Sequence, residues 1–179
     1  MLGIINRNFL DIDKSSFILL YKSLVRSHLE YAFAVWTPYK ISLINEIESV
    51  QKRATKMVKE CKKLCYRDRL KLPTLKYRRL RGDMIEVYKI LNNYYDAKVL
   101  PPLIRNYDTR TRGNSLKLAH IRCNLDIKKY SFSVSVVANW NSLPDTVILS
   151  SSLNAFKNSL DRHWSQQDIL YDYKSDIQL

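Results

Sequence analysis

The chain has 179 residues, of which 46% are hydrophobic, with twelve Tyr, only three Gly and a formal net charge of +13. This is enough for one ordinary domain or two small lobes, and the composition is that of a globular, mostly helical protein rather than a disordered one. The longest apolar run, Tyr31 to Trp36, is too short to span a membrane. The N-terminal residues lack the layout of a secretory signal, and three Cys at no framework spacing are typical of intracellular thiols, so a nuclear or cytoplasmic location is expected.

The positive charge is concentrated in one stretch. Between Lys52 and Arg81, thirteen Lys and Arg are accompanied only by Glu60 and Asp68, a local excess of +11. The other residues, seventeen basic and fifteen acidic, are close to neutral. Such a field suggests a polyanionic partner, nucleic acid first and an anionic membrane second. The alternative is a solvated basic face that only keeps the protein soluble.

A first helix is predicted from about residue 13 to residue 35, ended by Pro38. Asp13 is its expected N-cap. His28 lies on the predicted apolar stripe, where a partly buried imidazole is expected rather than a ligand or a base. The stripe follows three- and four-residue steps and consists of Phe17, Leu20, Leu24, His28, Tyr31 and Val35.

A second helix is predicted from about residue 41 to residue 61. Its apolar side consists of Ile44, Ile47, Val50, Ala54, Met57, Val58 and Cys61. Almost opposite, a row of ammonium groups is formed by Lys52, Lys56, Lys59 and Lys63, with Arg53 beside it. This row suits a phosphate backbone and would also suit a lipid surface. The apolar side lacks the Trp and Phe of interfacial helices, which favours nucleic acid.

A third helix is predicted from about residue 75 to residue 95, with a stripe formed by Leu80, Met84, Val87, Leu91 and Tyr95. Its first turn carries Arg78, Arg79 and Arg81, where the helix dipole disfavours cations. Two interpretations stand side by side. The arginines could share a phosphate with the free N–H groups of the helix start, or they could reach acidic side chains elsewhere.

From residue 96 to residue 115 the helical pattern stops. The segment Thr109–Asn114 is a basic turn that contains Arg110 and Arg112. It could contact a phosphate backbone or be a surface loop without a binding role, and the sequence pattern does not distinguish the two.

The remaining chain is predicted as a smaller part of mixed α/β and irregular structure. A short strand is expected around residues 116–121. Residues 127–143 alternate partly like a strand, but their length favours a helix. A last helix runs from residue 153 to residue 164, with Ser152 as its cap and Phe156, Leu160 and Trp164 as its stripe. The expected organisation is thus a mostly α fold: a helical bundle (1–95), a basic linker (96–114), a small C-terminal part (115–166) and a frayed tail (167–179).

The sequence does not predict an independent enzyme. No two Asp are adjacent, as a two-metal polymerase site would favour, and no glycine loop for a nucleotide or catalytic Ser turn is present. A zinc site would need Cys61, Cys65, His120 and Cys123, but their spacing matches no common knuckle, so structural thiols are expected. No cofactor or metal is predicted for this chain.

A series of collinear blocks carries a family resemblance. They are Leu20–Tyr31, Val50–Lys56, Leu72–Leu75, Tyr77–Asp83, Ile85–Ile90, Thr111–Leu116 and Val137–Pro144. Together they resemble the segment downstream of the polymerase core in jockey-like LINE (non-long-terminal-repeat) retrotransposon reverse transcriptases. The resemblance covers nearly the whole chain, from Leu2 to about Trp164.

The resemblance implies a thumb and post-thumb region, whose helices hold a template–primer duplex. The palm, which bears the paired aspartates and binds Mg²⁺ in that family, has no counterpart here. We therefore expect a truncated, non-catalytic fragment of an RNA-directed DNA polymerase that binds the nucleic-acid backbone (RNA–DNA or DNA duplex) without sequence specificity, with no membrane or small-molecule partner. The alternatives are a helical protein-interaction module and a degenerate element remnant with no selected role. The residues expected to contact the backbone are Lys52, Arg53, Lys56, Lys59, Lys63, Arg78, Arg79, Arg81, Arg110 and Arg112.

Overall fold

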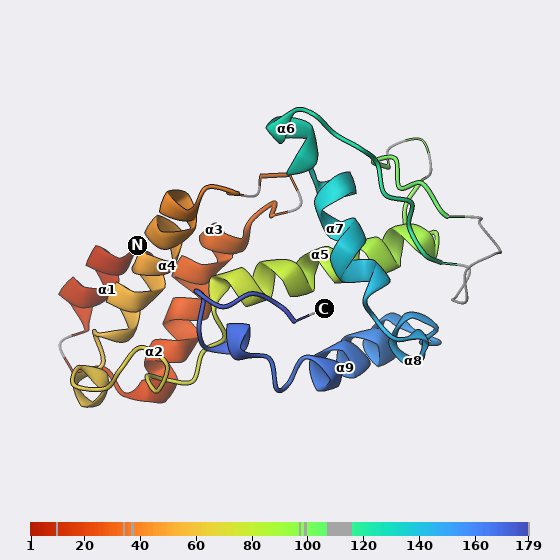
Figure 1. The fold of residues 1–179 in the computed structure, drawn as a ribbon. Helices are drawn as coiled ribbons and strands as arrows, with labels where there is room; N and C mark the ends of the chain where they lie inside the picture. Colours follow the sequence, from red (N-terminus) through yellow and green to blue (C-terminus); the bar gives the residue numbers. More distant parts are fainter. Residues whose placement is uncertain are drawn as a thin grey trace. The chain divides into compact units, whose positions relative to one another are not determined.

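The computed structural model describes residues 1–9, 11–33, 35–36, 38–96, 98, 100–106 and 116–178. Over these residues the fold is mostly helical, which confirms the fold class that the sequence predicts (Figure 1). The chain forms two compact units. The first combines Met1–Phe33, Pro38–Arg79 and Asp168–Asp176, and the second combines Ala34–Thr37, Leu80–Gln167 and Ile177–Leu179.

These boundaries differ from the predicted ones in two places. The sequence predicts an N-terminal part that reaches residue 95, whereas the division falls inside helix α5 (Leu75–Leu91), which contributes to both units. The sequence also predicts a frayed tail after residue 166, whereas Asp168–Asp176 belongs to the first unit. The composition of the tail is polar, but Thr74 donates hydrogen bonds to the carbonyls of Ile169 and Leu170 within this unit.

The first unit is built from short helices around one core. They are α1 (Leu2–Asn8), α2 (Lys14–Leu20), the π-helix η1 (Tyr21–Arg26), α3 (Ser27–Glu30), α4 (Ile41–Thr55), the 3₁₀ turn η2 (Lys59–Cys61), the first residues of α5 and the 3₁₀ turn η4 (Asp168–Leu170). The core cluster consists of Ile5, Phe17, Tyr21, Val25, Ala54, Val58 and Cys61. Helix α1 was not anticipated by the periodicity, and Ile5 is its one buried residue.

The first predicted helix begins where expected but buries a different stripe. The Asp13 carboxylate accepts a hydrogen bond from the Ser16 N–H (3.1 Å), which confirms the N-cap. The buried residues follow four-residue steps through Phe17, Tyr21 and Val25, and the predicted stripe residue His28 is exposed.

The π-helix explains this change of stripe. In α geometry a row spaced by four drifts by about 40° per step, because each residue turns about 100°. The wider turn of η1, with its i→i+5 hydrogen bonds, offsets that drift and keeps one line of side chains on the core. Continuous α geometry to residue 35 is therefore a wrong prediction: the helix ends at Glu30, and Ala32 adopts a positive φ of 55°.

Helix α4 ends at Thr55, six residues before the predicted end. The Thr55 hydroxyl donates a hydrogen bond to the Lys52 carbonyl (3.1 Å), and Val58 is extended. A continued helix would place Lys56, Lys59 and Lys63 at like-charged three- and four-residue spacings, which destabilise helices. The turn instead lets Val58 and Cys61 enter the core. Of the seven predicted apolar residues, Ala54, Val58 and Cys61 are buried, and the other four are partly exposed.

The second unit packs the rest of α5 with α6 (Asp126–Lys129), α7 (Phe132–Asn141), α8 (Asp145–Ile148) and α9 (Leu153–His163). Aromatic side chains fill its interior. The rings of Tyr88 and Phe156 stack with centroids 4.4 Å apart, and Trp140 lies 6.0 Å from Phe156. The predicted stripe of α9 is confirmed, because Phe156, Leu160 and Trp164 are all buried, and the Ser152 hydroxyl accepts a hydrogen bond from the Ala155 N–H (3.2 Å).

The strand predicted around residues 116–121 is reduced to a single contact. Leu118 forms an isolated antiparallel bridge with Arg105, and no strand is present among the described residues. The side-chain amide of Asn141 satisfies the Leu118 backbone in place of a neighbouring strand. Its Oδ1 accepts from the Leu118 N–H (2.9 Å), and its Nδ2 donates to the Leu118 carbonyl (2.8 Å).

The ambiguous segment 127–143 is helical, as predicted, but it is divided into α6 and α7 at Tyr130 and Ser131. Of the helices in the described part of the chain, none combines the length and the apolar character needed to cross a membrane.

Candidate nucleic-acid interface

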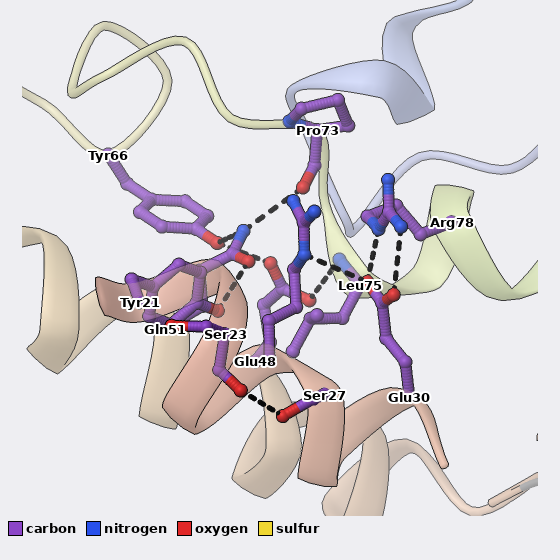
Figure 2. A network of polar contacts seen from close by, with 11 residues as sticks. Tyr21, Ser23, Ser27, Glu30, Glu48, Gln51, Tyr66, Pro73, Leu75 and Arg78 are labelled. Carbon is purple, nitrogen blue, oxygen red and sulfur yellow. Dashed lines mark hydrogen bonds and ion pairs between the residues drawn. The ribbon is translucent and has the colours of Figure 1, made fainter. Parts of the chain in front are cut away.

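A buried polar cluster is built around two side chains of α4, Glu48 and Gln51 (Figure 2). The Tyr21 hydroxyl donates to Gln51 Oε1 (2.7 Å), and Gln51 Nε2 donates to the Tyr66 hydroxyl (2.9 Å) and to the Pro73 carbonyl (3.1 Å). The Tyr66 hydroxyl in turn donates to Glu48 Oε1. Glu48 and Gln51 are almost completely buried. The cluster therefore ties α4 to the connector that precedes α5.

Two backbone N–H groups in the first turn of α5 are hydrogen-bonded by side chains. Glu48 Oε2 accepts a hydrogen bond from the Leu75 N–H (3.1 Å), and the Thr74 hydroxyl accepts one from the Tyr77 N–H (3.1 Å). A carboxylate at this position also suits the helix dipole. These two N–H groups are not free to bind a phosphate, so the phosphate interpretation of the arginine-rich turn loses its main support.

The ionisation of the cluster follows from its burial. Burial raises the pKa of the Glu48 carboxyl above its ordinary value, although the hydrogen bond from Tyr66 works in the opposite direction. Burial, and then the nearby Glu48 charge, also raise the pKa of Tyr21 and of Tyr66. Both phenols therefore remain protonated donors at neutral pH.

At the start of α5, Arg78 and Arg81 are paired with carboxylates. In the first unit, Arg78 forms a bidentate ion pair with Glu30, and the distance from Arg78 Nη2 to Glu30 Oε2 is 2.8 Å (Figure 2). In the second unit, Arg81 does the same with Asp161, with Nη2 to Oδ2 at 2.7 Å. Arg79 is buried. For Arg78 and Arg81 the structure thus shows the second interpretation, in which the arginines reach acidic side chains.

The predicted lysine row is not continuous. Lys52 lies at the edge of the buried face of α4, where its Nζ donates to the Tyr173 hydroxyl (2.8 Å). Lys59 lies beyond the end of α4, in η2, and pairs with Asp11 at the surface. Lys63 follows in the next turn. The physical reason is the early end of α4, since four lysines share one helix face only if the helix continues.

The exposed cations gather instead in a shorter segment. We call residues 53–63 the basic segment; its cations are Arg53, Lys56, Lys59, Lys62 and Lys63, and all five are exposed. Within the part of the chain that the structure describes, Arg53, Lys56, Lys62 and Lys63 have no carboxylate partner. Lys62 was missed by the sequence analysis because it falls off the predicted row, although the density of the run could have indicated it.

The acidic residue of the basic segment does not neutralise it. Glu60 pairs with Lys14 of α2 at 2.8 Å, and this hydrogen bond raises the pKa of the Lys14 ammonium. The pair between Lys59 and Asp11 is two-thirds exposed on both sides. Exposed pairs of this kind contribute little and exchange readily, so Lys59 is still accessible to a competing anion.

An open hollow of about 780 Å³ adjoins the basic segment in the first unit. Arg53 and Met57 line it together with residues of α1, η1, α3 and α4, namely Met1, Leu2, Gly3, Asn6, Val25, His28, Leu29 and Val50. Its lining is mainly apolar, and Arg53 and His28 are the two side chains with cationic forms. His28 is therefore not the partly buried core imidazole that the sequence predicts.

The remaining candidates of the sequence analysis are two arginines and the cysteines. Arg110 and Arg112 lie outside the described residues. Cys61 is buried in the core, as predicted, whereas Cys65 is exposed and its thiol donates to Asp68 (2.9 Å). Among the described residues, His, Cys, Asp and Glu side chains form no group of three that could hold a metal.

A scan against protein-family models, a search of curated proteins and a search of solved structures find no match to this chain. The described surface is that of a helical protein with one cation-rich segment displayed beside its core.

Proposed function

We propose that the chain binds the backbone of nucleic acids without reading their sequence, and that the basic segment is the contact surface. One observation carries the proposal: Arg53, Lys56, Lys62 and Lys63 are exposed and lack carboxylate partners among the described residues, while Glu60 is held by Lys14. Unpaired cations at this density attract a polyanion, and binding releases the counterions that surround it.

The chemistry of these cations favours phosphate contacts over base contacts. Three of the four are Lys, whose ammonium group is a point charge that binds phosphate oxygens in many geometries. Phosphate contacts position a protein on nucleic acid but carry no sequence information. Arg53 and Lys56 occupy adjacent surface positions at the end of α4, where the helix dipole also favours cations.

The likeness of the sequence blocks to LINE-type reverse transcriptases supports a more specific form of this proposal. In that form the chain is a non-catalytic fragment of a retrotransposon RNA-directed DNA polymerase, and the bound partner is a template–primer duplex. The helical fold of the first unit is compatible with such a role.

The test is the salt dependence of binding to a labelled duplex of random sequence. The wild-type protein should lose affinity steeply as salt rises, with a log–log slope of several units. The variant Arg53→Gln/Lys56→Gln/Lys62→Gln/Lys63→Gln should bind more weakly at low salt, and its slope should fall by up to about 3.5 units, since each lost contact contributes about 0.9.

The matched control is Arg122→Gln/Lys128→Gln/Lys129→Gln/Arg162→Gln, which removes the same charge from exposed positions of the second unit. It should retain most of the affinity and of the slope. Equal losses in the two variants would show that net charge alone drives binding, and a wild-type affinity that does not respond to salt would refute the proposal.

A protein-interaction module is the second candidate, and the apolar hollow is the observation that favours it. Arg53 and His28 on its lining favour a partner helix with an apolar ridge and an acidic edge. An undisturbed nucleic-acid signal in the quadruple Gln variant of the basic segment would support this candidate.

A further inference from the structure

The C-terminal residues Asp168–Asp176, here called the strap, lie against the first unit and divide into two halves by the way they are held. The inner half, η4, is anchored through the main chain. The Thr74 N–H donates to the Leu170 carbonyl (2.9 Å), and the Thr74 hydroxyl donates to the Ile169 carbonyl (2.7 Å). Thr74 and Ile169 are both fully buried. This half is part of the folded unit.

The outer half, Tyr173–Asp176, is held by two lysine ammonium groups. Lys52 Nζ lies 2.8 Å from the Tyr173 hydroxyl and 4.0 Å from the centre of its ring. Lys76 Nζ donates to the Ser175 carbonyl (2.7 Å) and forms an ion pair with Asp176. The Tyr173 ring also lies edge-on to the Tyr66 ring, with centroids 6.5 Å apart. The two ammonium groups are the part of this anchor that another anion could bind instead.

The two lysines belong to the cation-rich stretch between Lys52 and Arg81. Lys52 directly precedes the basic segment, and the strap brings two carboxylates to this stretch, because Asp168 pairs with Arg67 (3.5 Å) and Asp176 pairs with Lys76. The Lys76 side chain is only 15% exposed beneath the strap, whereas Asp176 is 89% exposed. The strap thus covers cations without burying its own charge.

We infer that the outer half of the strap is an intramolecular competitor, which occupies Lys52 and Lys76 and is displaced when a polyanion binds the basic segment. This inference rests on the proposed function. The exchange is favourable because the strap offers Lys76 one solvent-exposed carboxylate, whereas a phosphate backbone presents several charges and releases counterions. The inner half, held by Thr74 and Ile169, keeps the displaced residues close to the surface.

The experiment uses the full chain and the variant Tyr173→Ala/Asp176→Asn, which removes the Tyr173 contacts with Lys52 and the Asp176 charge beside Lys76. The Ser175 carbonyl is then the remaining contact of Lys76 with this half among those described. With the labelled duplex, this variant should bind about three- to tenfold more tightly than wild type at low salt, with a slope steeper by up to about 2 units because two cations become available. The control Asp126→Asn/Tyr130→Ala makes the same chemical changes in the second unit and should bind as wild type does.

A second readout does not depend on nucleic acid. Acetylation of amines, followed by peptide mass spectrometry, should modify Lys52 and Lys76 several-fold faster in the strap variant, while Lys128 reacts at an unchanged rate. The variant Tyr173→Phe/Asp176→Asn, which keeps the ring, is an alternative if the alanine variant does not fold.

The outcomes separate the two proposals. If wild type binds duplex and the strap variant binds equally, or if the control tightens as much, the competitor role is overturned while the proposed function stands. If neither protein binds duplex, the proposed function is overturned, and the competitor role fails with it even where the acetylation rates change.

Discussion

The carboxylate of Glu48 accepts a hydrogen bond from the backbone N–H of Leu75, 3.1 Å away, so a side chain in the middle of α4 caps the first turn of α5. The same carboxylate accepts from the Tyr66 hydroxyl, and its burial is nearly complete. One buried acid thereby joins two helices and the connector between them. The stability of the first unit is expected to depend on the ionisation of this acid.

Glu48→Gln should change the pH dependence of unfolding. Burial raises the pKa of Glu48 in the folded state, so the folded protein holds this proton more tightly than the unfolded chain. The contribution of Glu48 to stability is then full below the unfolded pKa of about 4.5 and is lost as pH rises through the folded pKa. The free energy of unfolding, measured in urea between about pH 4 and pH 7, should therefore shift in favour of the Gln variant with rising pH. A difference that is constant with pH would contradict this.

Glu30→Gln should destabilise the first unit more than Arg78→Gln does. Glu30 pairs with Arg78 and also lies 3.4 Å from Arg26, and its side chain is mostly buried. Without the carboxylate, two guanidinium groups remain together, and burial already lowers the pKa of Arg26, with Arg78 adding to the effect. We expect a loss of about 1–3 kcal/mol, measured by chemical denaturation.

The comparison with Arg78→Gln serves as the control for Glu30→Gln, because it removes one cation and leaves Glu30 with Arg26. Equal losses in the two variants would show that Glu30 stabilises only one of its two neighbours.

Asn141→Ala should loosen the second unit around Leu118. The amide makes two hydrogen bonds to the Leu118 backbone, and Leu118 is only 1% exposed. Their loss leaves a buried N–H and a buried C=O unsatisfied, at a cost of about 2–4 kcal/mol. Hydrogen exchange at the Leu118 amide should accelerate. Asn139→Ala in the same helix is the matched control, and an effect of similar size there would point to helix propensity instead.

Thr74→Val should weaken both the start of α5 and the anchor of the strap. The hydroxyl accepts from the Tyr77 N–H and donates to the Ile169 carbonyl, and valine has nearly the same shape. We expect a loss of about 2 kcal/mol in the free energy of unfolding. Thr55→Val is the control, because that buried hydroxyl bonds only to a carbonyl of its own helix. A cost as large for Thr55→Val would contradict this account.

Local signals in the sequence predicted those features that depend on neighbouring residues. The caps at Asp13 and Ser152 and the stripe of α9 follow from side chains three or four positions apart, and the structure confirms them. The mostly helical class follows in the same way from composition and periodicity.

The features that the sequence did not predict depend on contacts between distant residues. The pairing of Arg78 with Glu30 spans 48 positions, and that of Lys52 with Tyr173 spans 121. No local pattern indicates such partners, so the sequence left both interpretations of the α5 arginines open and predicted a frayed tail. The π-helix was missed for another reason. Apolar residues four positions apart also occur on α-helices, so the spacing of Phe17, Tyr21 and Val25 does not distinguish the two helix types.

The three cysteines differ in solvent exposure: Cys65 is exposed, Cys123 is partly exposed, and Cys61 is buried in the core of the first unit. Cys61 is also the last residue of η2, within the basic segment. A thiol reagent will therefore label Cys65 at once and Cys61 only when this core opens. In the wild-type chain, the rate of Cys61 labelling therefore reports how often the core behind the basic segment opens. A ligand that lowers this rate must bind to the closed form.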